Sequence, residues 1–503
     1  MKHALLVTTA VVTTLGIGLF TPCQPAFADE ETELLKKEIK ALEARIDQLE
    51  KREKTHKKQE ASANAYSSPA TGTASASGKS IAQRLNIVER NQELAQEDAQ
   101  AKAATTPKIE IGNGRGFTIT SADNQYSVRM SAYGQVQDRT FFDSSTTGPA
   151  NTFLMRALRP IIEGKMTDYF DGRMMMDFGK GSTTLLDAYA NFHPMPGNDI
   201  VNLRAGEMKV PVGIERWQGE TDLLFTERGQ TTNLVPFRDI GAMLYGQLIP
   251  DQLEYHLGIV NGATDLQVNT GDTDNNKDLA GRIMAHPLVW SGVHALEGVA
   301  VGVAGTYGVH QGTTASGNSD LTAGYVSPGQ RSYFTYTPTS GTDFANGVTW
   351  RANPQAMYYN GPFSLIGEYV LEEQEITNGT KNAGLRNQAW MGLATYVLTG
   401  EDASFTGVKP AHNFNPKAGD WGAFELAARY SQLDIDPKTF PTFANPATSA
   451  KKAQEFMGGV NWYFNPAVKI NLDAAFTTFD GGNTGNRNRA DEKVLMTEGQ
   501  FKF

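Results

Sequence analysis

Two segments of the sequence place phosphate-binding or metal-binding residue types close together. Residues 77–80 (Ser-Gly-Lys-Ser) end like a phosphate-binding loop, but Thr73 stands where such a loop needs its first glycine. Residues 272–278 begin like a calcium loop, but Lys277 occupies the position of the required glycine. The eight histidines lack metal-ligand spacing, and the sequence has no Gly-x-Ser-x-Gly nucleophile turn. The sequence therefore predicts no enzyme, no bound metal and no cofactor.

Composition narrows the class of protein further. The chain has 503 residues, a single cysteine and a formal net charge of -10. One cysteine excludes a disulfide framework, and the negative charge argues against a nucleic-acid partner. Basic and acidic residues balance over 1–107, so the whole excess of negative charge falls on residues 108–503.

The N-terminus has the pattern of an export signal. Lys2 precedes an apolar stretch that ends at Phe20, and Ala-Phe-Ala follows at 26–28. This pattern is typical of a secretory signal peptide, so we expect residues 1–28 to be removed together with Cys23. The mature chain would then carry no thiol.

The next segments are predicted to be helical and then flexible. Over residues 29–58 large apolar residues recur at alternating spacings of four and three, which predicts a coiled coil that joins copies of the chain. Those residues are Leu35, Ile39, Leu42, Ile46 and Leu49. The pattern favours self-association but leaves a dimer or a trimer open. Residues 59–107 are predicted to be a flexible tether rich in small residues, with a weak helix from Ile81 to about Ala101.

From Lys108 onward the apolar residues recur with a period of two, which indicates β-strands with one apolar and one polar face. In one such strand Leu472 and Ala474 alternate with Asp473. In another, the apolar face is expected to consist of Leu186, Ala188, Ala190 and Phe192, with Asp187 on the polar face. Such strands suit either soluble β-sandwiches or a transmembrane barrel whose apolar face meets lipid.

Three features favour the barrel, predicted over residues 108–503. No domain linker interrupts these residues, and the last strand ends on Phe503 with alternating apolar residues before it. Aromatic residues near predicted strand ends are expected to form the girdles at the two membrane interfaces. They are Trp350, Tyr358, Tyr359, Trp390, Trp462 and Tyr463. The length suits about sixteen strands, enough to enclose an aqueous pore.

Several motifs along this region resemble the phosphate-selective porin family of O and P type. They comprise Asp187-Ala-Tyr189, Gly206–Glu215, Leu223–Arg228, Asn233–Gly241, Leu398–Glu401, Trp421–Leu426 and Gly459–Tyr463. The resemblance implies an all-β, 16-stranded antiparallel transmembrane barrel that forms trimers in the outer membrane. It also implies a third loop that folds inward and constricts a channel for small hydrophilic solutes. The N-terminal helices would lie in the periplasm.

The same resemblance implies which residues meet the solute. By motif, Asp187 matches a carboxylate of the family's site and Arg228 one of its arginines. Arg216 falls at a basic position of the third loop, and Arg156 near a basic position of the wall. Guanidinium groups match phosphate oxygens, and a fixed carboxylate can accept a hydrogen bond from a protonated phosphate.

The sequence departs from this pattern on the inward loop. Glu220 and Thr221 stand where phosphate-specific members have a serine-lysine pair, and the predicted fifth loop, 324–350, offers only Arg331 and the adjoining Arg351. Phosphate specificity therefore does not follow from the family, and the choice between anions and cations stays open. A second hypothesis is that the coiled coil reaches the cell wall and makes the barrel an envelope anchor.

Neighbouring opposite charges leave a further alternative open. Glu227 and Arg228, like Arg238 and Asp239, could be local ion pairs that fix the loop or could contact the solute directly. Lys209 could equally brace a strand end or line the pore.

Overall fold

The computed structural model describes residues 85–97, 105–112, 116–142, 150–262, 274–314, 319–321, 324–336 and 342–503. The predicted signal peptide, the coiled coil over 29–58 and the first part of the tether lie outside these residues. Residues 85–97 form a helix within the predicted range of 81–101, and its side chains, including Leu85 and Val88, are exposed. None of the helices in these ranges combines the length and apolar character needed to cross a bilayer.

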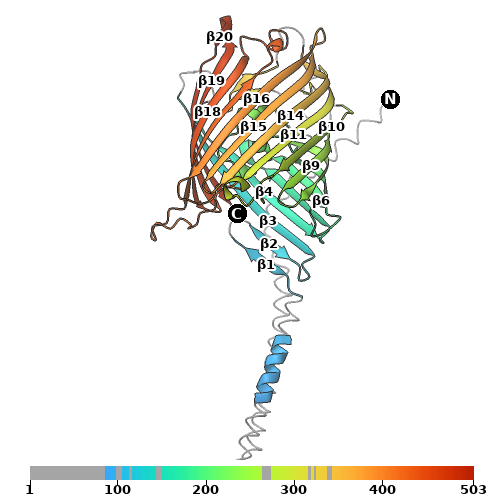
Figure 1. The fold of residues 1–503 in the computed structure, drawn as a ribbon, viewed down its shortest axis with the longest axis vertical. Coiled ribbons are helices and arrows are strands. Elements are labelled where there is room, and N and C mark those ends of the chain that lie inside the picture. The colour runs from blue at the N-terminus through green and yellow to red at the C-terminus, as the bar shows by residue number, and fades with distance from the viewer. Residues whose placement is uncertain are drawn as a thin grey trace, which may run out of the picture. The chain divides into compact units, whose positions relative to one another are not determined.

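Sixteen antiparallel strands form one closed barrel, which confirms the predicted fold (Figure 1). Each strand pairs with the next, and the last returns to the first, from Val494 opposite Phe141 to Lys502 opposite Tyr133. Closure satisfies every strand edge, which a bilayer requires. The sixteen are β3 (Tyr126–Phe141), β4 (Thr152–Met166), β5 (Phe170–Asp177), β6 (Thr184–Phe192), β7 (Asn202–Lys209), β8 (Arg238–Ile249), β9 (Leu253–Val260), β10 (Asp278–Ala285), β11 (Val299–Gln311), β14 (Phe344–Asn360), β15 (Phe363–Thr377), β16 (Asn382–Val397), β17 (Ala423–Asp434), β18 (Ala450–Asn465), β19 (Val468–Asn483) and β21 (Glu492–Lys502).

The remaining elements lie before the barrel or in its connections. The hairpin of β1 (Lys108–Ile111) and β2 (Phe117–Thr120) pairs with the first residues of β3. The connections hold β12 (Tyr325–Val326), β13 (Ser332–Phe334), β20 (Arg487–Asn488), α3 (Ile214–Trp217) and α4 (His294–Glu297). They also hold the 3-10 turns η1 (Gly179–Gly181), η2 (Glu220–Asp222), η3 (Gln230–Asn233), η4 (Pro437–Thr439) and η5 (Thr484–Asn486).

The strands turn their apolar side chains outward and their polar side chains into the lumen. On β19, Leu472 is 45% exposed whereas Asp473 is fully buried. On β21, Phe501 is 47% exposed and Glu498 only 3%. This inversion of the usual burial pattern is the one expected for a barrel surrounded by lipid.

Two of the predicted girdle residues were wrong. Tyr463 is buried and donates a hydrogen bond from its hydroxyl to Glu425 (2.7 Å), and Tyr359 packs against apolar clusters inside the barrel. Each follows an aromatic neighbour, Tyr358 or Trp462, and successive side chains of a strand point to opposite faces. Only one member of each aromatic pair can therefore face lipid.

The predicted lipid-facing position of Leu186 was also wrong. The pairing of β5 with β6 shifts register between Met175 and Met176, which leaves Leu186 as an extra residue in β6. Such a bulge interrupts the strict alternation of faces. As a result both Leu186 and its neighbour Asp187 are buried on the lumenal side.

Candidate solute-selective constriction

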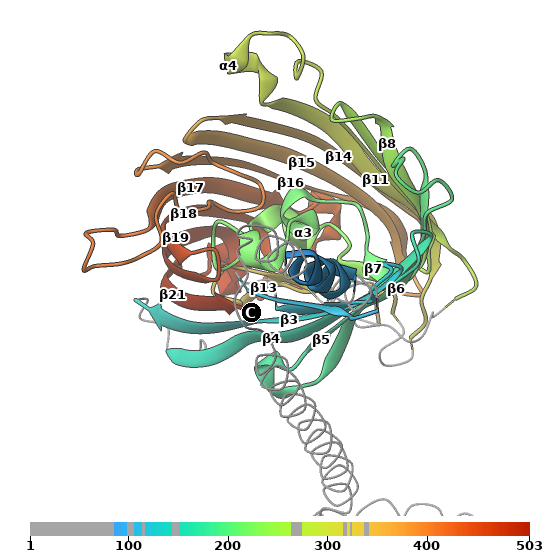
Figure 2. The same ribbon diagram turned by 90° about the horizontal axis from the view of Figure 1, so that it is seen from below.

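The connection between β7 and β8, residues 210–237, folds into the lumen, where Figure 2 shows α3 inside the ring of strands. It corresponds to the third loop. Gly213 begins the turn into α3 with φ of 81°, a left-handed conformation that favours glycine, and a Cβ there would lie 2.7 Å from Val235. Its backbone N–H donates to Asn353 on β14 (2.9 Å), and that of Ile214 donates to Glu368 on β15 (2.9 Å).

Further along, the inward loop is fixed to β17 to β19. The N–H of Thr226 donates to Asp473 (2.8 Å), and that of Gln230 donates to Ser431 (2.8 Å). The fully buried Arg429 of β17 binds Glu215 of the loop (2.7 Å) and Glu455 of β18 (2.6 Å). Polar groups of the wall thus hold the loop across the lumen.

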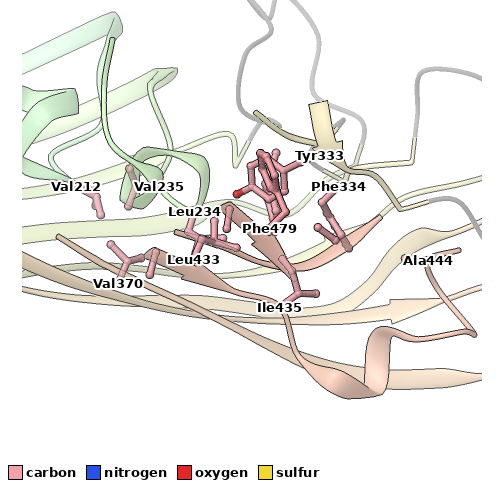
Figure 3. Packing of buried hydrophobic residues seen from close by; sticks show 14 of the residues in the cluster. Val212, Leu234, Val235, Tyr333, Phe334, Val370, Leu433, Ile435, Ala444 and Phe479 are labelled. Carbon is pink, nitrogen blue, oxygen red and sulfur yellow. The ribbon is translucent and has the colours of Figure 1, made fainter. Parts of the chain in front are cut away.

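The described part of a second connection, residues 312–343 between β11 and β14, packs against the inward loop. The Tyr333 hydroxyl donates to Gln230 (2.8 Å), and Asn233 donates to the Val326 carbonyl (3.1 Å). Apolar side chains from both connections and the wall form one cluster (Figure 3), in which Leu234 and Tyr333 are 1% exposed. The packing of these two connections therefore fills part of the lumen and fixes the shape of the space that stays open.

The predicted end of this fifth loop, residue 350, was wrong because β14 begins at Phe344. The register of β14 with β15 shifts between Ala345 and Thr349, and the strand continues through the irregularity. Arg351 consequently belongs to the wall, where it binds Glu372 (2.9 Å).

Among the described residues, two cavities lie on the side of the inward loop that faces β4 to β8. The first, of about 250 Å³, brings together Arg156, Arg216, Glu220 and Arg228. The second, of about 280 Å³, is lined by Asp187 and reaches the chain end at Phe503. Three side chains line both cavities, and we define them as the constriction: Arg159, Glu220 and Arg238.

Glu220 is the centre of an ion-pair network. Its carboxylate binds Arg228 (2.7 Å) of the same loop, and Arg156 (3.4 Å) and Arg159 (3.5 Å) of β4. Arg156 also binds Glu227 at 3.0 Å. Arg228 therefore reaches beyond its sequence neighbour Glu227 to a carboxylate eight residues away.

Asp187 and Arg216 occupy the two margins of this network. Asp187 accepts from Arg238 of β8 (2.8 Å) and lies 3.2 Å from Arg173 of β5, so Arg238 likewise binds a residue remote in sequence. Arg216 donates to the Thr232 carbonyl (2.8 Å) and lies over the ring of Phe237. Of the five residues singled out in the sequence, four share the first cavity, and Asp187 lines the second.

Sequence reasoning missed Arg159 and gave Arg238 only as part of a local pair. Strict alternation would place Arg156 and Arg159 on opposite faces of β4, since they are three residues apart. The pairing of β3 with β4 shifts between Gln135 and Val136, which leaves Arg156 as an extra residue. This bulge turns both arginines into the lumen. An arginine on the polar face of a strand near the Asp187 motif can reach the same part of the lumen as Asp187. This position is the signal that could have identified Arg159.

The composition of the first cavity determines what it can do. Five arginines line it: Arg156, Arg159, Arg216, Arg228 and Arg238. Four carboxylates line it: Asp177, Glu207, Glu220 and Glu227. Lys209 lines the second cavity and braces the loop, donating to the Gln218 carbonyl at 2.7 Å. A water-filled passage with guanidinium groups on its walls attracts anions.

Comparison with known proteins identifies the family of this chain. The family model described as phosphate-selective porin O and P matches residues 138–503. Porin O of Pseudomonas aeruginosa is 24% identical over 450 residues, which cover 80% of this chain and 96% of that protein. The crystal structure of the outer membrane channel DcaP of Acinetobacter baumannii is 11% identical with a TM-score of 0.50, covering 77% of this chain and 100% of that one. The last similarity concerns the fold alone.

Proposed function

We propose that this chain, which belongs to the phosphate-selective porin O and P family, conducts small anions in preference to cations. The protein is an outer-membrane porin, a channel for passive diffusion of small hydrophilic solutes. We propose in addition that this channel prefers anions. The supporting observation is the excess of arginines over carboxylates around the first cavity, with Arg159 and Arg238 at the constriction.

Local charge at the constriction outweighs the overall charge of the barrel region. In solvent at physiological ionic strength, charges farther than about 8 Å are largely screened, so the groups within reach of a passing ion dominate. The -10 of the chain includes carboxylates distributed over the whole barrel, such as Asp402 and Asp420, which line neither cavity. Inorganic phosphate is one of the small anions that could pass.

Planar-bilayer recording tests the proposal. In a tenfold gradient of potassium chloride, we expect discrete conductance steps and a reversal potential displaced toward the equilibrium potential of chloride. A reversal potential on the potassium side would contradict the anion preference. Absence of steps with correctly folded protein would contradict the pore itself.

We further propose that the protein is a homotrimer whose N-terminal helices lie in the periplasm. The apolar repeat over 29–58 supports association of copies, and so do the exposed apolar side chains of the helix over 85–97, among them Leu85 and Ile87. An unpartnered apolar stripe on a helix gains stability when it is covered. Outer-membrane lipid would surround the outward faces of the assembly.

Attachment to the cell wall through the same helices is the alternative role. Removing residues 29–107 behind an intact export signal is expected to leave the single-pore conductance unchanged, because the constriction is built entirely from later residues. If the helices anchor the barrel, the shortened protein will no longer co-sediment with purified peptidoglycan. Retention of co-sedimentation would exclude the anchoring role, and loss of conductance would contradict an independent barrel.

A further inference from the structure

The carboxylate of Glu220 occupies a position suited to a bound anion. One oxygen accepts from Arg228 at 2.7 Å and lies 3.5 Å from Arg159, while the other lies 3.4 Å from Arg156 and from Arg228. Three guanidinium groups therefore converge on one carboxylate, whose side chain is only 6% exposed. The convergence lies where the two cavities meet.

Guanidinium groups bind the oxygens of carboxylate, phosphate and sulfate in the same forked geometry. We propose that Glu220 is a tethered counter-anion that fills an oxyanion-binding clamp formed by Arg156, Arg159 and Arg228. The wild-type pore then attracts anions but does not retain oxyanions, because their site is already occupied. This inference rests on the proposed anion preference and names Glu220 as the residue that sets how tightly the pore binds oxyanions.

The three arginines keep other partners when Glu220 is removed. Arg159 remains bound to Asp177 (2.7 Å) and Tyr133, and Arg156 remains bound to Glu227 (3.0 Å). Arg228 still donates from Nε to the Glu215 carbonyl at 2.8 Å. These contacts hold the three guanidinium groups in place. Loss of the Glu220 carboxylate therefore frees N–H donors in a preorganised clamp and does not release the arginine side chains.

The test is block of single-channel chloride current by sulfate, which stays doubly charged over the working range of pH. In the Glu220→Gln variant we expect the half-blocking concentration of sulfate to fall about tenfold or more, since each charge-assisted hydrogen bond given to the ion is worth about an order of magnitude in affinity. Glu220→Asp, which keeps the charge, should resemble the wild type. Inorganic phosphate at neutral pH should repeat the sulfate result.

Asp222→Asn is the matched control, because Asp222 lies in the same turn, η2, and binds Lys502 (3.5 Å) outside the clamp. It removes the same charge and should leave sulfate block unchanged. Equal strengthening of block in both variants would overturn the proposal, and so would unchanged block in Glu220→Gln. Glu220→Ser receives the same measurement should the glutamine variant form no pores. Cation preference in the wild type would instead contradict the proposed function, so the two failures are distinguishable.

Discussion

Replacing both Arg159 and Arg238 by glutamine is expected to reverse the ion preference of the pore. These arginines line both cavities, and their removal changes the lining of the first cavity from five arginines and four carboxylates to three arginines and four carboxylates. At about 4 Å in water-like surroundings each unit charge contributes about 1 kcal/mol, so the loss of two positive charges disfavours the anion roughly thirtyfold and favours the cation by the same factor, and the two factors multiply in the anion-to-cation permeability ratio. Reversal potentials in a tenfold potassium chloride gradient measure it directly.

Arg282→Gln is the appropriate control for this reversal. Arg282 is also a buried lumenal arginine, but it lies on β10, binds Glu254, stands over the ring of Trp217, and is not part of either cavity lining. Its replacement should leave the anion preference intact. A double variant that stays as anion-selective as the control would show that the cations at the constriction do not set selectivity.

The second large effect is expected from Arg429→Met, which should destabilise the folded barrel by about 3–5 kcal/mol. Arg429 is fully buried and neutralises Glu215 and Glu455, and it also donates to the Glu227 carbonyl at 3.0 Å. Its removal leaves two carboxylates buried without their cation and takes away one of the anchors that hold the inward loop to β17, while the bond from Gln230 to Ser431 remains. Urea unfolding in detergent micelles, followed by tryptophan fluorescence, gives the change in the free energy of unfolding.

Arg386→Met provides the contrast, because the Arg386–Glu373 pair lies at 2.5 Å on β16 and β15 with Arg386 58% exposed. Exposed pairs contribute about 0–1 kcal/mol, so the unfolding midpoint should barely move. Similar losses in the two variants would contradict the special role of Arg429. We also expect noisier single-channel currents from Arg429→Met alone, because the loop that narrows the pore loses one of its anchors.

The sequence predicted the barrel well because a strand's two faces are a local property. Alternation such as Leu472-Asp473-Ala474 needs only the period of two, and it holds wherever the pairing is regular. By the same rule, adjacent residues such as Trp462 and Tyr463 point to opposite faces of the strand. They therefore cannot both belong to one girdle. The family motifs placed Asp187 and Arg228 near the inward loop, but they could not state which charges meet.

The sequence by itself therefore determined the strands, their outward apolar faces and the approximate size of the pore. Only the tertiary structure decided the constriction. Bulges at Arg156 and Leu186 change which side chains face the lumen, and a bulge depends on the partner strand's register. Glu220 meets Arg159 because the inward loop is anchored to strands far along the chain. Such contacts depend on long-range pairing and loop path, to which no local periodicity in the sequence corresponds.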